Sequence, residues 1–230
     1  MAGIPGRAVP WGRSLEEYSR MFDLSARDLA GKILDCAAGP ASFNAEMHRR
    51  GASVVSCDPL YEFSADGIRK RIGENYDMMV EASKQRREQF IWQEIQSPEH
   101  LGQVRMQAMN LFLEDFPAGI FEGRYRPSEL PALPFRDGEF DLALCSHFLF
   151  TYSDSLTIEF HLDSIRELCR VAKEARIFPL LPSFASERSP HLSAVIEELT
   201  AEGYACEVTR VPYEFQKGAN EMLRVSPSRF

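Results

Sequence analysis

Residues 33–43 read ILDCAAGPASF, an apolar run typical of a buried strand that enters a turn of small residues and then the start of a helix. Gly39 lies in the turn, Ala37 and Ala41 lie beside it, and Asp35 lies near the end of the strand. Small side chains let a ligand approach the backbone, and the free N–H groups at the start of a helix favour an anionic group. The stretch therefore predicts a ligand-binding turn at the carboxyl end of a strand.

The strands expected around this turn define the fold class. Residues 32–36 and 53–57, joined through a helix, predict a right-handed parallel βαβ unit. Further runs typical of strands follow at 120–124, 140–146, 176–181, 207–215 and 221–225, and the last two predict a hairpin. We therefore expect an α/β fold with a seven-stranded, mainly parallel Rossmann-like sheet, one antiparallel strand near its edge, and helices on both faces.

The segment at about 62–116 interrupts the alternation of strands and helices. Ile68, Ile72 and Tyr76 recur at helical spacing, and so do Leu101, Val104 and other apolar residues further along. We interpret residues 1–230 as a single domain that carries a helical insertion in this segment. Ligands bind at the carboxyl ends of the strands in such sheets, and the insertion is well placed to cover them. We expect it to shape a ligand pocket.

Composition narrows the class of protein. The chain has 230 residues, with 26 Lys and Arg against 34 Asp and Glu and a net charge of −8, which argues against broad nucleic-acid binding because phosphate affinity needs clustered cations. The five cysteines are an odd number without a C-x-x-C pair, which argues against disulfides and zinc. No apolar run approaches the roughly 20 residues of a membrane span, and the N-terminus does not resemble a secretory signal. We expect a cytoplasmic protein without a membrane segment.

Two acids indicate what the turn binds. Asp58 follows the second strand, where an acid can accept both hydroxyls of a ribose. A dinucleotide site prefers G-x-G-x-x-G, but only Gly39 of this turn is a glycine, and a carboxylate at Asp35 would repel a pyrophosphate. The same carboxylate suits a ligand that carries an ammonium group. The alternatives are that Asp35 caps the turn and that Asp58 belongs to an Asp-Pro turn. The histidines His48, His100, His161 and His191 are scattered and predict no metal site.

Together these stretches resemble the class I S-adenosylmethionine-dependent methyltransferases. ILDCAAGPASF is similar to their first motif, an acid followed by G-x-G-x-G; VVSCDPL (54–60) is similar to their second, and LPALPFRDGEFDLALCSHFLF (130–150) to their third-to-fourth motif region. The resemblance covers most of residues 14–61 and 120–225. Two motif glycines are replaced by alanine, which costs little where positive φ is not needed. Glu129 stands where the family usually has Asp.

The resemblance implies a binding site for S-adenosyl-L-methionine. Asp35 and the turn would hold the methionine moiety, Asp58 the ribose, and Glu129 the adenine amino edge. His147 would lie beside the sulfonium as a candidate general base, because its ordinary pKa of about 6.5 lies close to neutral pH; the alternative is a strand-end histidine that transfers no proton. The full set of implied cofactor-binding residues is Arg13, Tyr18, Asp35, Ala37, Gly39, Pro40, Asp58, Pro59, Leu60, Glu129, Leu130 and Ser146.

The expected function is methyl transfer to an unidentified acceptor, and the acidic composition favours a small molecule over nucleic acid. The protein's main task would be to hold the nucleophile and the methyl group in line. Two other classes stay open. One is a non-catalytic regulatory module that binds S-adenosylmethionine or S-adenosylhomocysteine. The other is an NAD-dependent oxidoreductase, which would explain Asp58 but neither Asp35 nor the missing glycines. The sequence predicts no oligomeric state.

Overall fold

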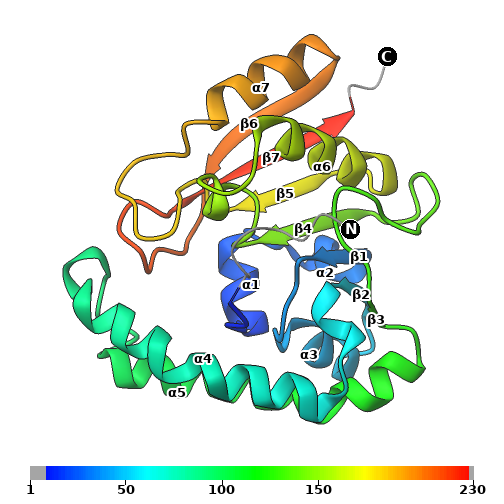
Figure 1. Cartoon of the computed structure of the whole chain (residues 1–230). Helices are drawn as coiled ribbons and strands as arrows, with labels where there is room; N and C mark the ends of the chain where they lie inside the picture. The colour runs from blue at the N-terminus through cyan, green and yellow to red at the C-terminus, as the bar shows by residue number, and fades with distance from the viewer. Residues whose placement is uncertain (1–8, 228–230) are drawn as a thin grey trace.

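The computed structural model describes residues 9–227 and contains a seven-stranded sheet of order β3-β2-β1-β4-β5-β7-β6 (Figure 1). Neighbouring strands from β3 to β5 are parallel, whereas β7 is antiparallel to both β5 and β6. The strands are β1 Lys32–Cys36, β2 Ser53–Cys57, β3 Tyr125–Arg126, β4 Leu142–Ser146, β5 Ala175–Phe178, β6 Tyr204–Arg210 and β7 Glu221–Pro227. The predicted mainly parallel sheet, with one antiparallel strand near its edge, is confirmed.

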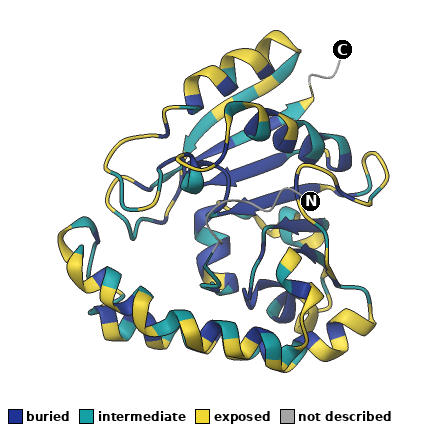
Figure 2. Ribbon diagram, viewed as in Figure 1, coloured by how far each residue is buried: buried dark blue, intermediate teal, exposed yellow. Residues whose placement is uncertain are grey.

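Helices cover both faces of this sheet, as predicted. They are α1 Leu15–Met21, α2 Ala26–Ala30, α3 Phe43–Arg49, α4 Ala65–Gln85, α5 Pro98–Phe121, α6 Ile158–Val171 and α7 Leu192–Ala201, with the 3-10 turns η1 Pro59–Glu62, η2 Arg87–Gln89 and η3 Phe150–Tyr152. Successive side chains of a strand point to opposite faces. In β1, Ile33 packs in a cluster with residues of α1 and α3, and Leu34 packs in a cluster with residues of α6 and α7. Figure 2 shows the central strands buried between these helices.

The third strand differs from the prediction. We expected a strand at 120–124, but α5 continues to Phe121 and β3 comprises only Tyr125 and Arg126. The side chain of Phe121 is 93% exposed, so its strand propensity is not used in packing. The end of α5 instead lies against Tyr125, and a Cβ atom added at Gly119 would lie 2.3 Å from its ring. The other strands lie where expected, with ends shifted by a few residues.

The segment between β2 and β3 forms two long helices that pack against each other along one side of the molecule (Figure 1). Met109, Phe112 and Phe116 of α5 share a core cluster with Tyr61 and Tyr125. At its other end the pair is tied to the segment before β7, because the amide of Ile91 donates to the carbonyl of Phe215 over 2.8 Å. No helix within residues 9–227 is both long and apolar enough to cross a membrane.

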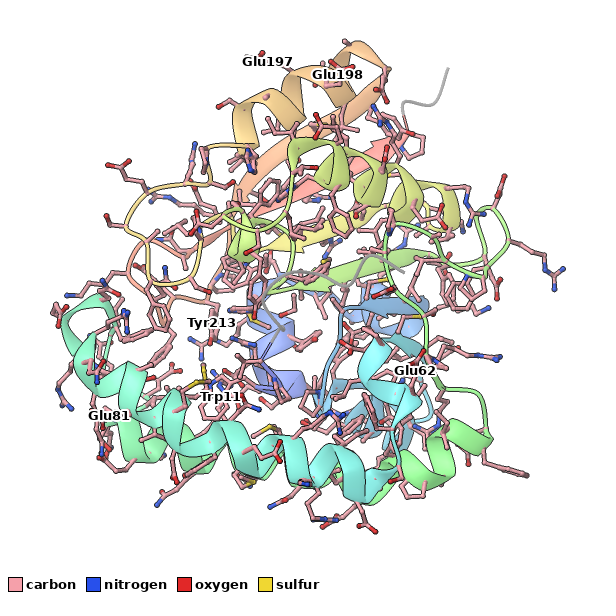
Figure 3. All side chains as sticks on the ribbon, in the orientation of Figure 1. Trp11, Glu62, Glu81, Glu197, Glu198 and Tyr213 are labelled. Carbon is pink, nitrogen blue, oxygen red and sulfur yellow. The ribbon has the colours of Figure 1, made fainter. Side chains whose placement is uncertain are left out.

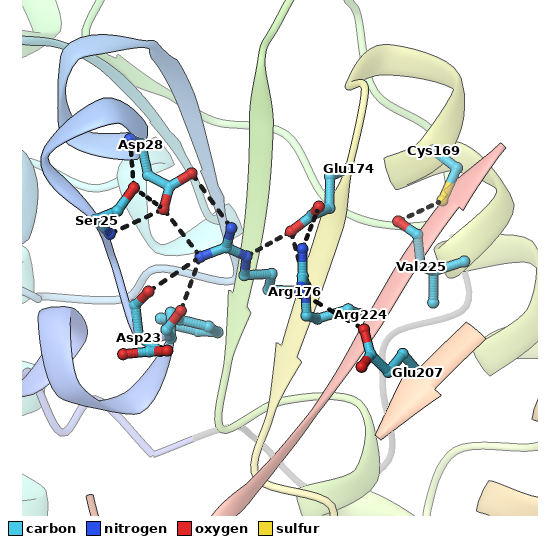
Figure 4. A network of polar contacts seen from close by, with 10 residues as sticks. Asp23, Ser25, Asp28, Cys169, Glu174, Arg176, Glu207, Arg224 and Val225 are labelled. Atoms are coloured by element: carbon cyan, nitrogen blue, oxygen red, sulfur yellow. Dashed lines mark hydrogen bonds and ion pairs between the residues drawn. The ribbon is translucent and has the colours of Figure 1, made fainter. Parts of the chain in front are cut away.

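A buried arginine joins the sheet to α2, away from the carboxyl ends of the strands. The guanidinium of Arg176, in β5, donates to Asp28 and to the carbonyl of Phe22, and it pairs with Glu174 over 2.6 Å (Figure 4). Arg224 of β7 also pairs with Glu174. A charge this deeply buried is tolerated only with such partners, so the network has a structural role.

Candidate functional site

The carboxyl ends of β1, β2 and β4 border a cleft, and the N-terminal segment before α1 forms another side of it. The turn after β1 and the 3-10 turn η1 after β2 lie next to each other there. Residues 128–130 and 146–148 complete the lining. Of the residues that the resemblance implies, the cleft is lined by Arg13, Tyr18, Ala37, Gly39, Pro40, Asp58, Pro59, Leu60, Glu129, Leu130, Ser146 and His147.

The turn after β1 has a left-handed backbone at two positions. Gly39 has a φ of +54°, which a glycine adopts without strain, and Ala37 has a φ of +53°. Alanine costs little only where a positive φ is not needed, and Ala37 has a positive φ. A side chain in this region of the backbone map lowers stability by about 1 kcal/mol or more. The left-handed backbone at Ala37 is therefore adopted at some cost in stability.

Asp58 ties this turn to the end of β2. Its Oδ2 accepts a hydrogen bond from the amide of Gly39, and its Oδ1 accepts one from the amide of Leu60, each over 2.8 Å. Burial raises the pKa of Asp58 to about 6, although these two amide donors lower it. At neutral pH the carboxylate is mainly ionised, and each oxygen keeps a further lone pair. Asp58 can thus accept hydroxyl groups of a ligand in the cleft.

The carboxyl of Asp35 lies behind the residues that line the cleft. It is fully buried; its Oδ1 accepts from the hydroxyl of Tyr18 over 3.2 Å and its Oδ2 from that of Ser56 over 3.4 Å. Burial raises the pKa of Asp35 to about 8, so the group is mainly neutral at pH 7. In the protein without a ligand, Asp35 is thus connected to the cleft through the hydroxyl of Tyr18, and its contact with an ammonium group stays a prediction.

A second cavity of about 320 Å³ adjoins the cleft. Val9, Trp11, Arg13, His147 and Tyr152 line both spaces. The helices α4 and α5 contribute Met79, Ser83, Leu101 and Arg105, and much of the remaining wall is aromatic, including Phe90, Phe178, Tyr213 and Phe215. Figure 3 shows Trp11 and Tyr213 in the space between the body of the fold and the α4–α5 pair. The inserted helices thus form part of the wall of this cavity.

His147 lies where the two spaces meet, directly after β4. Its backbone has a φ of +50°, and its Nδ1 lies 2.9 Å from the hydroxyl oxygen of Ser146. Burial holds the pKa of His147 well below its usual value, and the positive charges of Arg13 and Arg105 lower it further. The imidazole is therefore neutral at pH 7 and has a nitrogen that can accept a proton.

Sequence reasoning missed Trp11, Arg105 and Tyr213. Arg105 had a detectable signal, because it lies in the apolar stripe that contains Leu101 and Ala108, at positions one helical turn apart. A cation in such a stripe is either paired or placed toward a cavity. Trp11 and Tyr213 come from irregular segments, where periodicity carries no information. Within residues 9–227, no group of three or more His, Cys, Asp or Glu residues could hold a metal ion.

No protein-family model matches the chain. Uncharacterized protein MJ0045 of Methanocaldococcus jannaschii is 33% identical over 213 residues, which are 92% of this chain and 93% of that protein.

Structural similarity extends to several solved proteins. Magnesium protoporphyrin IX methyltransferase (ChlM) from Synechocystis with bound SAM is 15% identical, covering 88% of this chain and 73% of its own, with a TM-score of 0.44. The TehB-like SAM-dependent methyltransferase from Corynebacterium glutamicum is 14% identical. The match covers 87% of this chain and 81% of that protein, with a TM-score of 0.45. The putative RNA methyltransferase PH1948 from Pyrococcus horikoshii is 10% identical. The match covers 87% of this chain and 76% of that protein, with a TM-score of 0.43. At TM-scores below 0.5, such likeness does not indicate an activity.

Proposed function

Because the chain belongs to the same family as Uncharacterized protein MJ0045, whose name assigns no activity, we propose from the geometry of the cleft that it is a methyltransferase. It would transfer a methyl group from S-adenosyl-L-methionine to a small molecule. The observation that carries the proposal is the junction of two cavities at His147, one beside Asp58 and the small-residue turn, the other largely apolar. Group transfer between two ligands requires two such adjoining sites.

The residues of the first cleft fit the cofactor. Asp58 has free lone pairs for the two ribose hydroxyls, and the turn at Ala37 and Gly39 leaves room for a ligand against the backbone. Glu129 and Leu130 would meet the adenine edge, with Pro59 and Leu60 beside the ring. Asp35 acts as a positioning residue, because it holds the hydroxyl of Tyr18, which lines the cleft.

When bound, the cofactor supplies a methyl group activated by the sulfonium. The chain has to hold the acceptor atom in line with that methyl group and to exclude competing water. The low pKa of His147 keeps the imidazole neutral, so it can accept a hydrogen bond from the acceptor group, whereas the same low pKa makes it a weaker base than a histidine in water. The contact with Ser146 orients the ring between the two spaces.

A small acceptor is supported by the shape of the second cavity. Its wall is built from six stretches of the chain between Val9 and Ala219, and it is more apolar than polar. The net charge of −8 also disfavours a polyanionic acceptor such as RNA. The helices α4 and α5 contribute to the wall, so they would help to select the acceptor.

Calorimetric titration with S-adenosylhomocysteine and, separately, with NAD tests the proposal. We expect the first to bind and NAD not to bind. Asp58→Asn removes the negative charge that accepts the ribose hydroxyls, and hydrogen bonds to a charged group are worth about 1.5–3 kcal/mol, so affinity should fall at least about tenfold. The control Asp137→Asn changes an exposed acid and should leave affinity unchanged.

Two results would contradict the proposal. Tighter binding of NAD would favour an oxidoreductase, and equal affinities of the wild type and the Asp58→Asn variant would remove the ribose contact on which the assignment depends. Cofactor binding without methyl transfer to any of a broad acceptor panel would favour the regulatory module instead.

A further inference from the structure

The second cavity carries uncompensated positive charge. Its lining contains Arg13 and Arg105 but no aspartate or glutamate within the described residues. Arg105 pairs with Glu17, Nη1 to Oε2, over 2.5 Å. Glu17 also accepts from the hydroxyl of Tyr213 over 3.0 Å and from the amide of Ser14 over 3.2 Å, so its carboxylate is already engaged. Two cations against one anion leave a net charge of about +1 beside the cavity.

Both guanidinium groups also hold a buried nitrogen without a partner. In the part of the chain that the structure describes, neither Nε of Arg13 nor Nε of Arg105 makes a hydrogen bond, and the hydroxyl of Thr151 in the same wall is also unpaired. Arg105 is only 1% exposed. Arg13 donates one hydrogen bond, from Nη1 to the carbonyl of Trp11 over 3.1 Å. Buried donors of charged groups are normally paired, so these Nε atoms are donors in the cavity wall that still lack a partner.

We infer that this cavity binds a small apolar, preferably aromatic, molecule that carries one carboxylate, and that Arg13 and Arg105 hold that carboxylate. The inference deepens the proposed function and rests on it insofar as the molecule is the methyl acceptor. Arg13 and His147 line both spaces. An acceptor anchored at Arg13 would therefore lie close to His147 and to the cofactor cleft.

Charge and shape favour a carboxylate over other anions. A carboxylate carries one negative charge, which matches the residual charge of the cavity, whereas a phosphate monoester carries about 1.5 to 2 at neutral pH. The planar guanidinium edge at Nε fits the two oxygens of a carboxylate. The remaining wall, with Phe90, Phe178, Tyr213 and Phe215, fits an aromatic body. An ammonium group would be repelled by both arginines.

The test compares matched probes on the full chain by calorimetry at neutral pH, with and without S-adenosylhomocysteine. The probes are 1-naphthylacetate, its neutral amide 1-naphthylacetamide, and 1-naphthyl phosphate, with phenylacetate and phenylacetamide as a smaller pair. The carboxylate of each pair should bind at least about tenfold more tightly than its amide, and the naphthyl phosphate should bind more weakly than 1-naphthylacetate.

Variants locate the site. Arg105→Lys keeps a charge beside Glu17 but removes the planar edge, so it should reduce the preference for the carboxylate severalfold or more and leave S-adenosylhomocysteine affinity unchanged. Arg69→Lys alters an exposed arginine on α4 and should change neither affinity. Thr151→Val, which removes the unpaired hydroxyl, serves as a second variant and should weaken carboxylate binding severalfold. The comparison of probe pairs on the wild type needs no variant.

Equal binding of acid and amide, tighter binding of the phosphate, or no binding of either carboxylate to the folded protein would overturn the inference. So would an undiminished carboxylate preference in both Arg105→Lys and Thr151→Val. If S-adenosylhomocysteine does not bind while the carboxylate preference holds, the carboxylate site stands and the proposed function fails. If S-adenosylhomocysteine binds and the preference is missing, the inference alone fails.

Discussion

Replacing Asp35 by asparagine should stabilise the protein at neutral pH. The folded state holds this carboxyl protonated, with a pKa of about 8, whereas an unperturbed aspartate has a pKa of 3.8. Between these two values the unfolded chain releases a proton that the native chain retains. The contribution of Asp35 to stability is therefore full below pH 3.8 and decreases as the pH rises to about 8.

The structure sets the size of this effect. Each pH unit inside the window lowers the free energy of unfolding by at most about 1.4 kcal/mol, so the wild type loses on the order of 4 kcal/mol by pH 7. Asparagine resembles the neutral acid: its Oδ1 can accept from Tyr18, and its amide can donate to the oxygen of Ser56, whose hydroxyl donates to Asp35 in the wild type and has to turn to another acceptor. The Asp35→Asn variant should keep the contact with Tyr18 and reverse the direction of the one with Ser56, without the pH-dependent loss.

Urea unfolding of both proteins at several pH values measures the difference. The advantage of Asp35→Asn should grow by about 1.4 kcal/mol per unit between about pH 5 and pH 7. Asp115→Asn is the control of opposite sign: Arg124 and Tyr125 hold the pKa of Asp115 low against burial, so that substitution should destabilise more as the pH rises from acid to neutral. A pH-independent difference for Asp35→Asn would refute the assignment of a neutral Asp35.

Two further predictions concern backbone and packing. Ala37→Gly should stabilise the protein by about 1 kcal/mol in chemical denaturation, since the φ of +53° is strained only for the side chain; a loss of stability would show that the strain is absent. Gly119→Ala should destabilise by about 1–3 kcal/mol because its Cβ meets the ring of Tyr125, whereas Gly73→Ala in α4, with open space around it, should stabilise by up to about 1 kcal/mol. If both alanine variants shift the melting temperature equally, the packing argument fails.

Local pattern was sufficient for much of the fold. The mainly apolar runs at 32–36 and 140–146 predict buried strands because a strand covered on both faces has no polar alternation. The expected strand at 120–124 was wrong because apolar residues at the end of a long helix look like a short strand, and only the contact between α5 and Tyr125 distinguishes the two. Short runs of this kind are ambiguous to periodicity.

The candidate site shows the same division. Asp58 could be placed from sequence, since parallel strands bring their carboxyl ends to one edge of the sheet, and the structure joins it to Gly39. The role of Asp35 could not be predicted from sequence. Whether a residue at the end of a strand faces the cleft or the interior depends on which element covers that face of the sheet, and here α1 covers it with Tyr18. Burial then favours the neutral form of the Asp35 carboxyl, which no local pattern encodes.

The sequence by itself determined most of the order of strands and helices, the small-residue turn after β1 and the acid after β2, since these depend on residues close together in the chain. Only the tertiary structure decided the second cavity. Arg13, Arg105 and His147 come from segments far apart in sequence, and the unpaired Nε donors of the two arginines result from packing. Contacts between residues distant in sequence determine whether a charged side chain is buried and which groups it can pair with. The cavity and its charge could therefore be recognised only from the tertiary structure.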